Sequence, residues 1–360
     1  MLLTRSLLAF VFIAFSFDVA GASSDDDLKS ALKVELDREA SDGRFAGAVL
    51  VAHSGTPIFV AANGEANIAL KQPNTQETKF RFGSMGKMFT AVAIAQLVQA
   101  GKVEVDAPLS KYLPDYPNKQ VAKVTIHQLL THTGGTGDIF GPEFIAQRSN
   151  LKEIRDYVRL FGARDPLFAP GSRHEYSNFG FILLGRVIEV VSGRSYDAYV
   201  REQIFAPAGM SSTDNLPEDR HIEGLAVPYG PGLSSAEDAL PYRGTSAGGG
   251  YTTVGDLLKF ANALVAHRLL DAKHTELITI GKVDTPMLGM RYAYGFEDAT
   301  LPDGTRRIGH SGGAPGINGV LSIYPQSGYV VAVLANRDPP AAMEIDRFIA
   351  RRLAPPPSRP

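Results

Sequence analysis

The chain has 360 residues, of which 44% are hydrophobic and 21% charged, values typical of a soluble globular protein with a large core. The formal net charge is -2 and no basic cluster is interleaved with aromatic residues, which argues against nucleic-acid binding. The chain contains no cysteine, which excludes disulfide bonds, zinc–thiolate sites and lipid attachment through cysteine.

The first 22 residues have the pattern of a secretory signal peptide. Arg5 precedes an apolar run over residues 7–17, and small residues at 20–22 offer a cleavage site before Ser23. The apolar run is too short to span a bilayer comfortably, so we expect no stable membrane insertion after cleavage. An uncleaved anchor is the alternative, because Asp18 makes the cleavage region slightly unusual. The sequence therefore predicts an exported protein, periplasmic or secreted.

The first elements of the mature chain are a helix and a hairpin. Residues 25–41 predict an amphipathic helix, and residues 46–62 predict a β-hairpin. A strand-like run at residues 79–82 then leads through Gly83 into an apolar helix over residues 88–98.

Ser84 and Lys87 lie three residues apart at the start of this apolar helix. Positions i and i+3 share one helix face, so the Lys87 ammonium can reach the Ser84 hydroxyl. Serine becomes a nucleophile when a base takes its proton, and a desolvated lysine can act as that base. Ser30 and Ser149 have the same spacing to a lysine, but only Ser84 stands between a strand-like run and an apolar helix. The pattern predicts a serine hydrolase of the serine–lysine type.

A second motif, Tyr176 and Asn178, precedes an apolar helix over residues 181–191. A phenol beside a lysine can be held partly or wholly ionised and act as a base or proton shuttle. An asparagine side chain supplies both a donor and an acceptor. The alternative interpretation is a loop with an asparagine turn.

A third motif, Gly-His-Ser-Gly-Gly at residues 309–313, contains His310 and precedes two strand-like runs. Gly312 and Gly313 would let backbone N–H groups approach a substrate closely. The alternative interpretation is a glycine-rich hairpin.

The same five residues fit the nucleophile elbow, glycine–x–serine–x–glycine, with Ser311 as nucleophile. An elbow joins a strand to a helix and has its histidine partner later in the chain. Strand-like runs at residues 319–324 and 329–335 follow instead, and no histidine lies downstream of Ser311. We therefore reject the elbow.

The remaining elements include a predicted capping box at residues 253–256, which starts a helix over residues 256–266. Residues 341–353 predict a final helix, and the proline-rich tail at 354–360 is predicted to be disordered.

No pattern indicates a metal or a cofactor, and we expect neither. His127 and His132 are five residues apart rather than four, and no nearby carboxylate completes a zinc site. Gly86 and Lys87 lack the other residues of a phosphate-binding P-loop. The glycines at residues 248–250 favour a tight backbone crossing over a phosphate cradle.

The three motifs, with Leu-Leu-Thr-His-Thr-Gly-Gly at residues 129–135 and Ser-Ala-Gly-Gly-Gly at 246–250, occur in an order that resembles a known family. This is the family of class C β-lactamases, penicillin-binding DD-peptidases and related serine esterases. The resemblance runs from about residue 45 to residue 336.

The resemblance implies a role for each motif residue. Ser84 would be the acylated nucleophile, while Lys87 and Tyr176 would share general-base and general-acid catalysis. Asn178 would orient Lys87 and bind the substrate. The backbone N–H groups of Ser84 and Gly313 would form the oxyanion hole.

The resemblance also implies an α+β fold of the β-lactamase/DD-peptidase type. An antiparallel sheet built from both ends of the chain would be flanked by the terminal helices, with a mainly helical subdomain inserted. The single domain, residues 23–353, would have an α/β part at about 23–83 and 245–353 and a helical part at about 84–244. The active site would lie in the cleft between the two parts.

The third motif departs from the β-lactamase branch, in which its first residue is typically a lysine that helps to hold the substrate carboxylate. His310 is largely neutral near pH 7 unless its environment perturbs it. We therefore expect a small-molecule ester, amide or peptide-like substrate without an obligatory carboxylate, bound partly by Asn178, His310, Gly312 and Gly313. The alternatives are a β-lactamase or DD-peptidase of the same fold, and a non-catalytic penicillin-binding-like binder or sensor.

Overall fold

The computed structural model describes residues 25–353. The predicted signal peptide at residues 1–22 and the predicted disordered tail at residues 354–360 lie outside the described residues. None of the helices in the described range is both long and apolar enough to cross a membrane.

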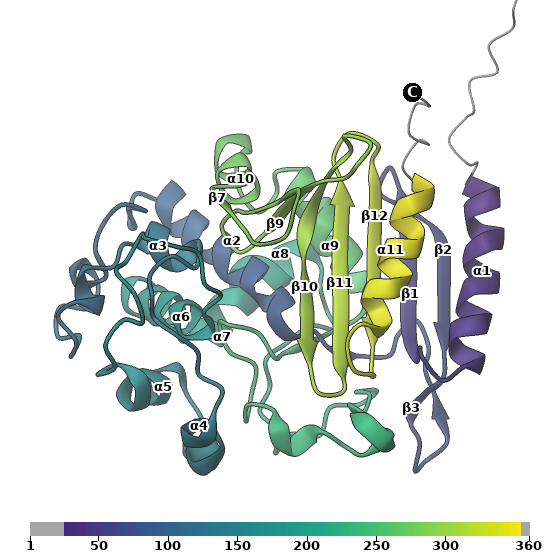
Figure 1. The fold of residues 1–360 in the computed structure, drawn as a ribbon, viewed down its shortest axis with the longest axis horizontal. Coiled ribbons are helices and arrows are strands. Elements are labelled where there is room, and N and C mark those ends of the chain that lie inside the picture. The colour runs from purple at the N-terminus through teal and green to yellow at the C-terminus, as the bar shows by residue number, and fades with distance from the viewer. Residues whose placement is uncertain (1–24, 354–360) are drawn as a thin grey trace, which may run out of the picture.

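An eight-stranded antiparallel sheet, in the order β2-β1-β12-β11-β10-β9-β8-β7, forms the centre of the fold (Figure 1). The two ends of the chain meet within it, because β1 pairs with β12 and places Gly47 opposite Ala335. The strands are β1 Gly47–His53, β2 Thr56–Asn63, β7 Val283–Asp284, β8 Met290–Tyr292, β9 Glu297–Thr300, β10 Arg306–Ala314, β11 Ile317–Tyr324 and β12 Tyr329–Ala335.

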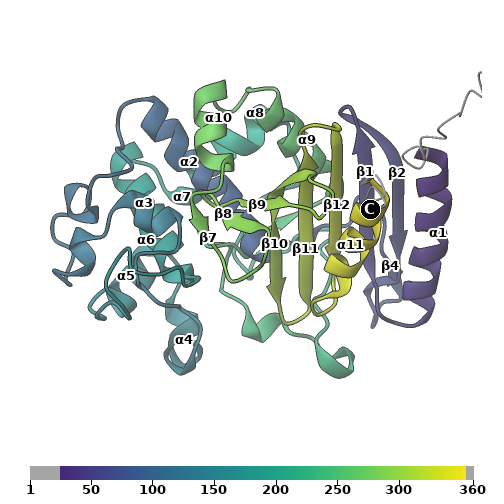
Figure 2. The ribbon, with the colours of Figure 1, turned by 45° about the horizontal axis from the view of Figure 1, so that its top comes forward.

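Both faces of the central strands are covered, which is why these strands are apolar along nearly their whole length. Val49 and Val51 pack on one face with residues of the terminal helices α1 (Asp25–Ser41) and α11 (Ala341–Leu353). Leu50 belongs to the larger core on the opposite face, with residues of helices α2 (Gly86–Gln99) and α9 (Val254–Val265). Figures 1 and 2 show α1 and α11 together on the same side of the sheet. The predicted α+β architecture, with the terminal helices flanking an antiparallel sheet, is confirmed.

Most of the remaining helices lie beyond the β7 edge of the sheet or behind it (Figure 2). The α-helices are α2 Gly86–Gln99, α3 Ile126–Leu130, α4 Pro142–Gln147, α5 Ile154–Phe161, α6 Asn178–Ser192, α7 Tyr196–Val200, α8 Ala206–Ala208, α9 Val254–Val265 and α10 Ala272–Thr279. Short 3₁₀ turns occur at Gly83–Met85, Leu109–Lys111, Val121–Lys123, Arg148–Asn150, Pro231–Leu233 and Glu237–Ala239, and a π turn at Arg201–Phe205. Two small sheets pair β3 Glu65–Asn67 with β4 Gln72–Pro73 and β5 Phe80–Arg81 with β6 Tyr251–Thr252.

The predicted capping box before α9 forms only in part. Thr253 Oγ1 accepts a hydrogen bond from the Asp256 N–H at 3.1 Å, which confirms the N-cap. The Asp256 carboxylate does not return to the cap, because it accepts instead from Ser212 N at 2.7 Å and Thr213 Oγ1 at 2.9 Å. A tertiary contact therefore replaces the local one.

The glycine-rich hairpin considered for residues 309–313 is present: these residues lie in strand β10, which turns at Pro315 and Gly316 and pairs antiparallel with β11. A Cβ atom on Gly309 would lie 1.8 Å from Leu321 O, and one on Gly312 would lie 2.1 Å from Phe82 O. The glycines allow neighbouring backbone to approach the strand, rather than allowing the chain to turn.

The tight crossing predicted at residues 248–250 is confirmed. Gly249 N donates to Gly83 O at 3.1 Å, and Phe82 N donates to Gly250 O at 3.0 Å. A Cβ on Gly248 would lie 2.0 Å from Gly83 O, so only glycine lets this segment pass so close to the turn before α2.

Candidate active site

Ser84 lies in the 3₁₀ turn Gly83–Met85, between strand β5 and helix α2. The turn begins with a positive φ of 53° at Gly83, a conformation that favours glycine. A Cβ on Gly83 would also lie 3.1 Å from Gly313 N, so glycine lets strand β10 approach the turn. Ser84 is half-buried at the point where the two segments meet.

Lys87, in the first turn of α2, is fully buried and has three hydrogen-bond acceptors. Its Nζ donates to Ser84 Oγ at 3.2 Å, to Asn178 Oδ1 at 2.7 Å and to Ala247 O at 2.7 Å. Burial lowers the pKa of Lys87 to about 7, against an opposing effect of the negative charge on Asp138. Near neutral pH a large fraction of Lys87 is therefore unprotonated and able to accept a proton from Ser84.

Asn178, the first residue of α6, connects Lys87 to Asp138. Its Nδ2 donates to both carboxylate oxygens of Asp138, at 3.1 and 2.9 Å, which leaves its Oδ1 facing Lys87. Asp138 also accepts from the backbone N–H groups of Ile139 and Phe140, at 2.6 and 3.0 Å. No motif in the sequence singles out Asp138; its place in the glycine-rich loop after residues 129–135 is the signal that could have identified it.

Tyr176 lies beside the candidate nucleophile, and its hydroxyl is hydrogen-bonded with Ser84. The residue as a whole is 38% exposed, and its ring packs on that of His132 with centroids 4.3 Å apart. Desolvation raises the pKa of Tyr176 above its usual value, against the opposing effect of the hydrogen bond with Ser84. The raised pKa favours a neutral Tyr176 with a proton to donate over the partly or wholly ionised phenol considered from the sequence.

His310 is 3% exposed and has partners for both ring nitrogens. Nδ1 lies 2.5 Å from Ser311 O and must be the donor, so Nε2 accepts from the Tyr292 hydroxyl at 3.0 Å. Burial also lowers the pKa of His310, which keeps the imidazole neutral. The position therefore holds no permanent cation, as expected from the sequence. Both ring nitrogens are already hydrogen-bonded within the protein, so neither is free to bind substrate.

Strand β10 directs the Gly313 N–H toward Ser84. Ser311 N contacts Glu297 Oε1 at 3.4 Å, so the N–H of Ser311 points away from β11. Backbone direction repeats every two residues in a strand, so the Gly313 N–H points to the same side. Gly312 points differently: its carbonyl accepts from Asn318 Nδ2 at 3.0 Å, and the residue packs against Phe82. Gly312 therefore allows β10 to pack closely against Phe82. Two cavities open beside Ser84, and Gly312 lines neither of them.

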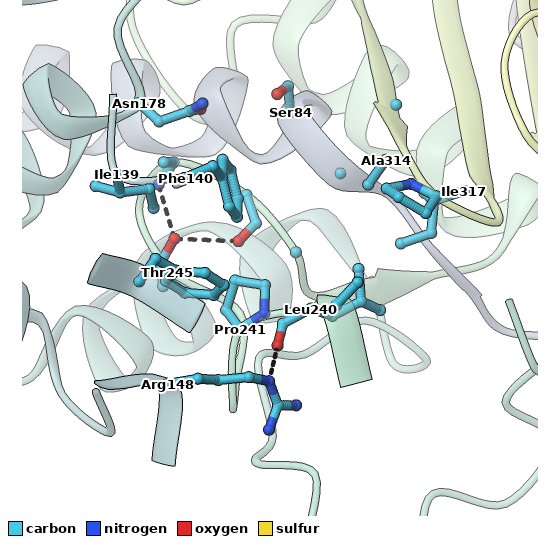
Figure 3. Close-up of a pocket in the computed structure, with 18 of the residues that line it drawn as sticks. Ser84, Ile139, Phe140, Arg148, Asn178, Leu240, Pro241, Thr245, Ala314 and Ile317 are labelled. Carbon is cyan, nitrogen blue, oxygen red and sulfur yellow. Dashed lines mark hydrogen bonds between the residues drawn. The ribbon is translucent and has the colours of Figure 1, made fainter. Parts of the chain in front are cut away.

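The first of these cavities, here called the apolar cavity, has a volume of about 640 Å³. Figure 3 shows Ser84 at one end, Phe140 and Ile317 on facing walls, and Arg148 at the far end. Arg148 Nε donates to Leu240 O at 2.5 Å. Apolar side chains dominate the wall: Ile139, Phe140, Phe144, Ile145, Leu240, Pro241, Ala247, Ala314, Pro315 and Ile317.

The second cavity, here called the acidic cavity, has a volume of about 530 Å³ and lies on the Tyr176 side of Ser84. Ser84 and Gly313 line both cavities, so each cavity opens onto the candidate nucleophile. The acidic cavity is lined by Ser84, His174, Glu175, Tyr176, Thr285, Pro286, Met287, Met290, Tyr292, Glu297, His310, Ser311 and Gly313.

Ser311 is not placed as an elbow nucleophile. It lies on a strand that continues to another strand, and its Oγ donates to Glu297 Oε1 at 3.0 Å. The structure thus brings Ser84, Lys87, Tyr176, Asn178 and Gly313 together, and it adds Asp138.

Comparison with known proteins agrees with this geometry. The chain matches the family described as "Beta-lactamase" over residues 33–355. A solved penicillin-binding protein from Bacillus halodurans is 34% identical, with a TM-score of 0.81 over 88% of this chain and 99% of that one. A D-stereospecific amidohydrolase from Streptomyces sp. is 27% identical, with a TM-score of 0.74 over 86% of this chain and 94% of that one.

The curated esterase EstB of Burkholderia gladioli is also similar. It is 28% identical over 334 residues, which cover 81% of this chain and 83% of the esterase. The family match covers far more than half of the sequence, and the solved structures superpose on most of the chain with TM-scores of 0.74 and 0.81. The chain therefore belongs to the Beta-lactamase family of serine hydrolases and has the fold of the β-lactamases and penicillin-binding proteins.

Proposed function

We propose that this protein is a serine hydrolase that cleaves carboxylic esters or peptide-like amides through an acyl-enzyme on Ser84. The observation that carries the proposal is the buried Lys87 Nζ, held between Ser84 Oγ and Asn178 Oδ1. A lysine with a pKa of about 7 is matched to proton transfer near neutral pH.

In the first half of the reaction, neutral Lys87 takes the Ser84 proton as Oγ attacks the substrate carbonyl carbon. The negative charge that develops on the carbonyl oxygen is stabilised by the N–H groups of Ser84 and Gly313. Tyr176 donates its proton to the leaving group as the carbonyl–heteroatom bond breaks, and protonated Lys87 then restores the phenol. Water attacks the acyl-enzyme in the second half and releases the acid and Ser84.

The position of Tyr176 indicates which cavity would hold the leaving group and which would hold the acyl group of the substrate. The general acid must stand next to the leaving group, and Tyr176 lines only the acidic cavity. The leaving group therefore occupies the acidic cavity, and the acyl group occupies the apolar cavity. Burial of apolar surface in that cavity favours substrates with an apolar acyl chain.

The esterase and the amidohydrolase among the similar proteins support the substrate class. A β-lactamase or DD-peptidase remains the alternative of the same fold. It is less well supported, because none of the described residues that line the acidic cavity is a lysine or arginine that could hold a substrate carboxylate. Export to the periplasm or medium is part of the proposal and rests on the first 22 residues; mass spectrometry of the mature N-terminus tests it.

Labelling with a fluorophosphonate, followed by mass spectrometry of the modified peptide, tests the nucleophile. We expect the label on Ser84. Ser84→Ala should abolish both labelling and hydrolysis of an activated ester, while Ser311→Ala should keep a substantial fraction of the activity. Labelling of Ser311, or full activity in Ser84→Ala, would overturn the proposal.

A further inference from the structure

The lining of the acidic cavity contains acidic side chains without basic ones, a balance of charge that does not suit anionic substrates. It contains the carboxylates of Glu175 and Glu297, and none of the described residues that line it is a lysine or arginine. The two acidic residues are therefore the formally charged members of the lining.

Glu297 is the more buried of the two carboxylates, with a side chain that is 16% exposed. It begins β9, and the Ser311 hydroxyl donates to its Oε1 at 3.0 Å, which fixes its direction. Arg307 Nη2 lies 4.0 Å from Oε2, but Arg307 Nη1 is paired with Asp346 at 3.0 Å. One guanidinium is thus shared by two carboxylates, and the charge on Glu297 is incompletely compensated.

The negative charge on Glu297 influences the pKa values of neighbouring groups in the site. It contributes to raising the pKa of Tyr176 and of Tyr292, and it acts against the lowering of the pKa of His310 by burial. Glu175 is different, since its side chain is 44% exposed and forms an ion pair with Arg173 at 2.8 Å. Glu297 is therefore the carboxylate available to a bound cation.

The other walls suit a cation as well. The rings of Tyr176 and Tyr292 and the thioethers of Met287 and Met290 line the cavity. Aromatic faces attract ammonium groups, quaternary ones included, through their ring quadrupole. A cation bound here would gain chiefly from the Glu297 carboxylate and the exposed part of the Tyr176 ring, because Tyr292 is 3% exposed and Lys87 Nζ already lies 4.7 Å from the Tyr176 ring centroid.

We propose that the acidic cavity binds a positively charged leaving group, with Glu297 as its counter-ion. The preferred substrates are then esters of amino alcohols or amides of diamines, whose acyl part fills the apolar cavity. The bond cleaved is still the acyl carbon–heteroatom bond, and water supplies the oxygen of the released acid. This inference rests on the proposed function.

A matched pair of substrates tests the inference without any mutation. A choline ester and the 3,3-dimethylbutyl ester of the same acid have leaving groups of nearly the same shape, but only choline is charged. We expect kcat/KM to favour the choline ester by about tenfold at low ionic strength, in keeping with one partly buried ion pair. The preference should shrink as salt is added, because the cavity is open to solvent.

Glu297→Gln and Glu175→Gln form a matched pair of variants. Glutamine at 297 keeps an oxygen for the Ser311 hydroxyl but removes the charge, so the ratio of choline to neutral ester should fall to within about twofold of unity. Glu175→Gln should keep most of the wild-type ratio, because that charge is already paired with Arg173 at the surface.

The outcomes of these experiments distinguish failure of the cationic leaving group from failure of the proposed function. Hydrolysis of the neutral ester with fluorophosphonate labelling at Ser84, but equal kcat/KM for the two esters, would overturn the cationic leaving group and leave the proposed function standing. An unchanged preference in Glu297→Gln would overturn the role of Glu297. Absence of hydrolysis of both esters together with absence of labelling at Ser84 would overturn both proposals.

Discussion

At the scale of single residues, the environment of Lys87 matters more than its identity. A lysine in water has a pKa near 10.4 and is a poor base at neutral pH. Complete burial disfavours the ammonium form and lowers the pKa to about 7, while Asn178 and Ala247 still supply hydrogen-bond acceptors. The neutral amine required by the proposed mechanism is therefore present at physiological pH.

This pKa predicts a pH dependence of kcat/KM for a neutral ester. Activity needs unprotonated Lys87, so it should rise with pH through about 7 and level off above pH 8. Lys87→Ala should lower kcat by about 10²-fold or more and remove this titration. A wild-type profile that is flat between pH 5.5 and 8.5 would contradict the role of Lys87 as base.

Asp138 acts through Asn178 and is a positioning residue. Its negative charge raises the pKa of Lys87, so Asp138→Asn should move the rising limb of the pH profile to lower pH. Loss of the carboxylate that holds Asn178 should also reduce kcat by about tenfold, less than loss of the base itself. Steady-state kinetics of the variant between pH 5 and 9 measure both effects.

Asp165→Asn is the matched control, since Asp165 also accepts from an asparagine amide, Asn118 Nδ2, at 2.8 Å, but lies at the exposed surface. It should change neither the rate nor the pH profile. A shift of the profile to higher pH in Asp138→Asn would contradict the electrostatic argument.

At the scale of elements, strand β10 and the 3₁₀ turn before α2 form the site by close backbone contact. A Cβ on Gly312 would lie 2.1 Å from Phe82 O, so β10 can approach this segment so closely only with a glycine at position 312. The strand carries Gly313 into the site, so the separation of these two elements sets the geometry of the proposed oxyanion hole.

Gly312→Ala should therefore push β10 away from the turn. We expect a loss of about 1–3 kcal/mol in the free energy of unfolding, the usual cost of overpacking, together with reduced kcat. Urea denaturation and ester kinetics measure the two effects. Gly255→Ala, in helix α9, is the control, because its Cβ would meet only Thr253 Oγ1 at 3.8 Å. It should be neutral or stabilising by up to about 1 kcal/mol, and equal losses in both variants would refute the packing argument.

At the scale of the whole molecule, Ser84 stands between two cavities whose walls come from segments far apart in the chain. Ile139 and Phe140, Leu240 and Ile317 form walls of the apolar cavity, although more than 70 residues separate each of these segments from the next. The selection of an acyl group is therefore a property of the folded chain.

The apolar cavity predicts a dependence on acyl chain length. From acetate to hexanoate esters of one alcohol, kcat/KM should rise by up to about fourfold per methylene, the equivalent of about 0.8 kcal/mol of burial. Phe140→Asp places a charge on the cavity wall at a residue that is 49% exposed, and it should flatten this series without unfolding the protein.

Leu167→Asp is the matched control, because Leu167 is 62% exposed and does not line the cavity. It should leave the chain-length series unchanged. A wild-type series that falls with chain length would contradict the assignment of the acyl group to this cavity.

The sequence by itself determined the elements that have a clear local pattern and the local half of the candidate site. Periodicity and turn residues predicted helices α1, α2, α6, α9 and α11 and the β1–β2 hairpin, because these patterns depend on near neighbours in the chain. The spacing of Ser84 and Lys87 on one helix face is local as well. The order of the three motifs was specific enough to predict the fold.

Only the tertiary structure decided the electrostatics and the cavities. The Asn178–Asp138 contact spans 40 residues, and those of Lys87 with Asn178 and Ala247 span 91 and 160. The pKa values of Lys87 and Tyr176 depend on burial, which no spacing in the sequence reveals. Glu297 and the walls of the two cavities likewise come from segments far apart in the chain. The sequence thus predicted candidate groups for the reaction, and packing of distant segments sets their protonation and the space left for substrate.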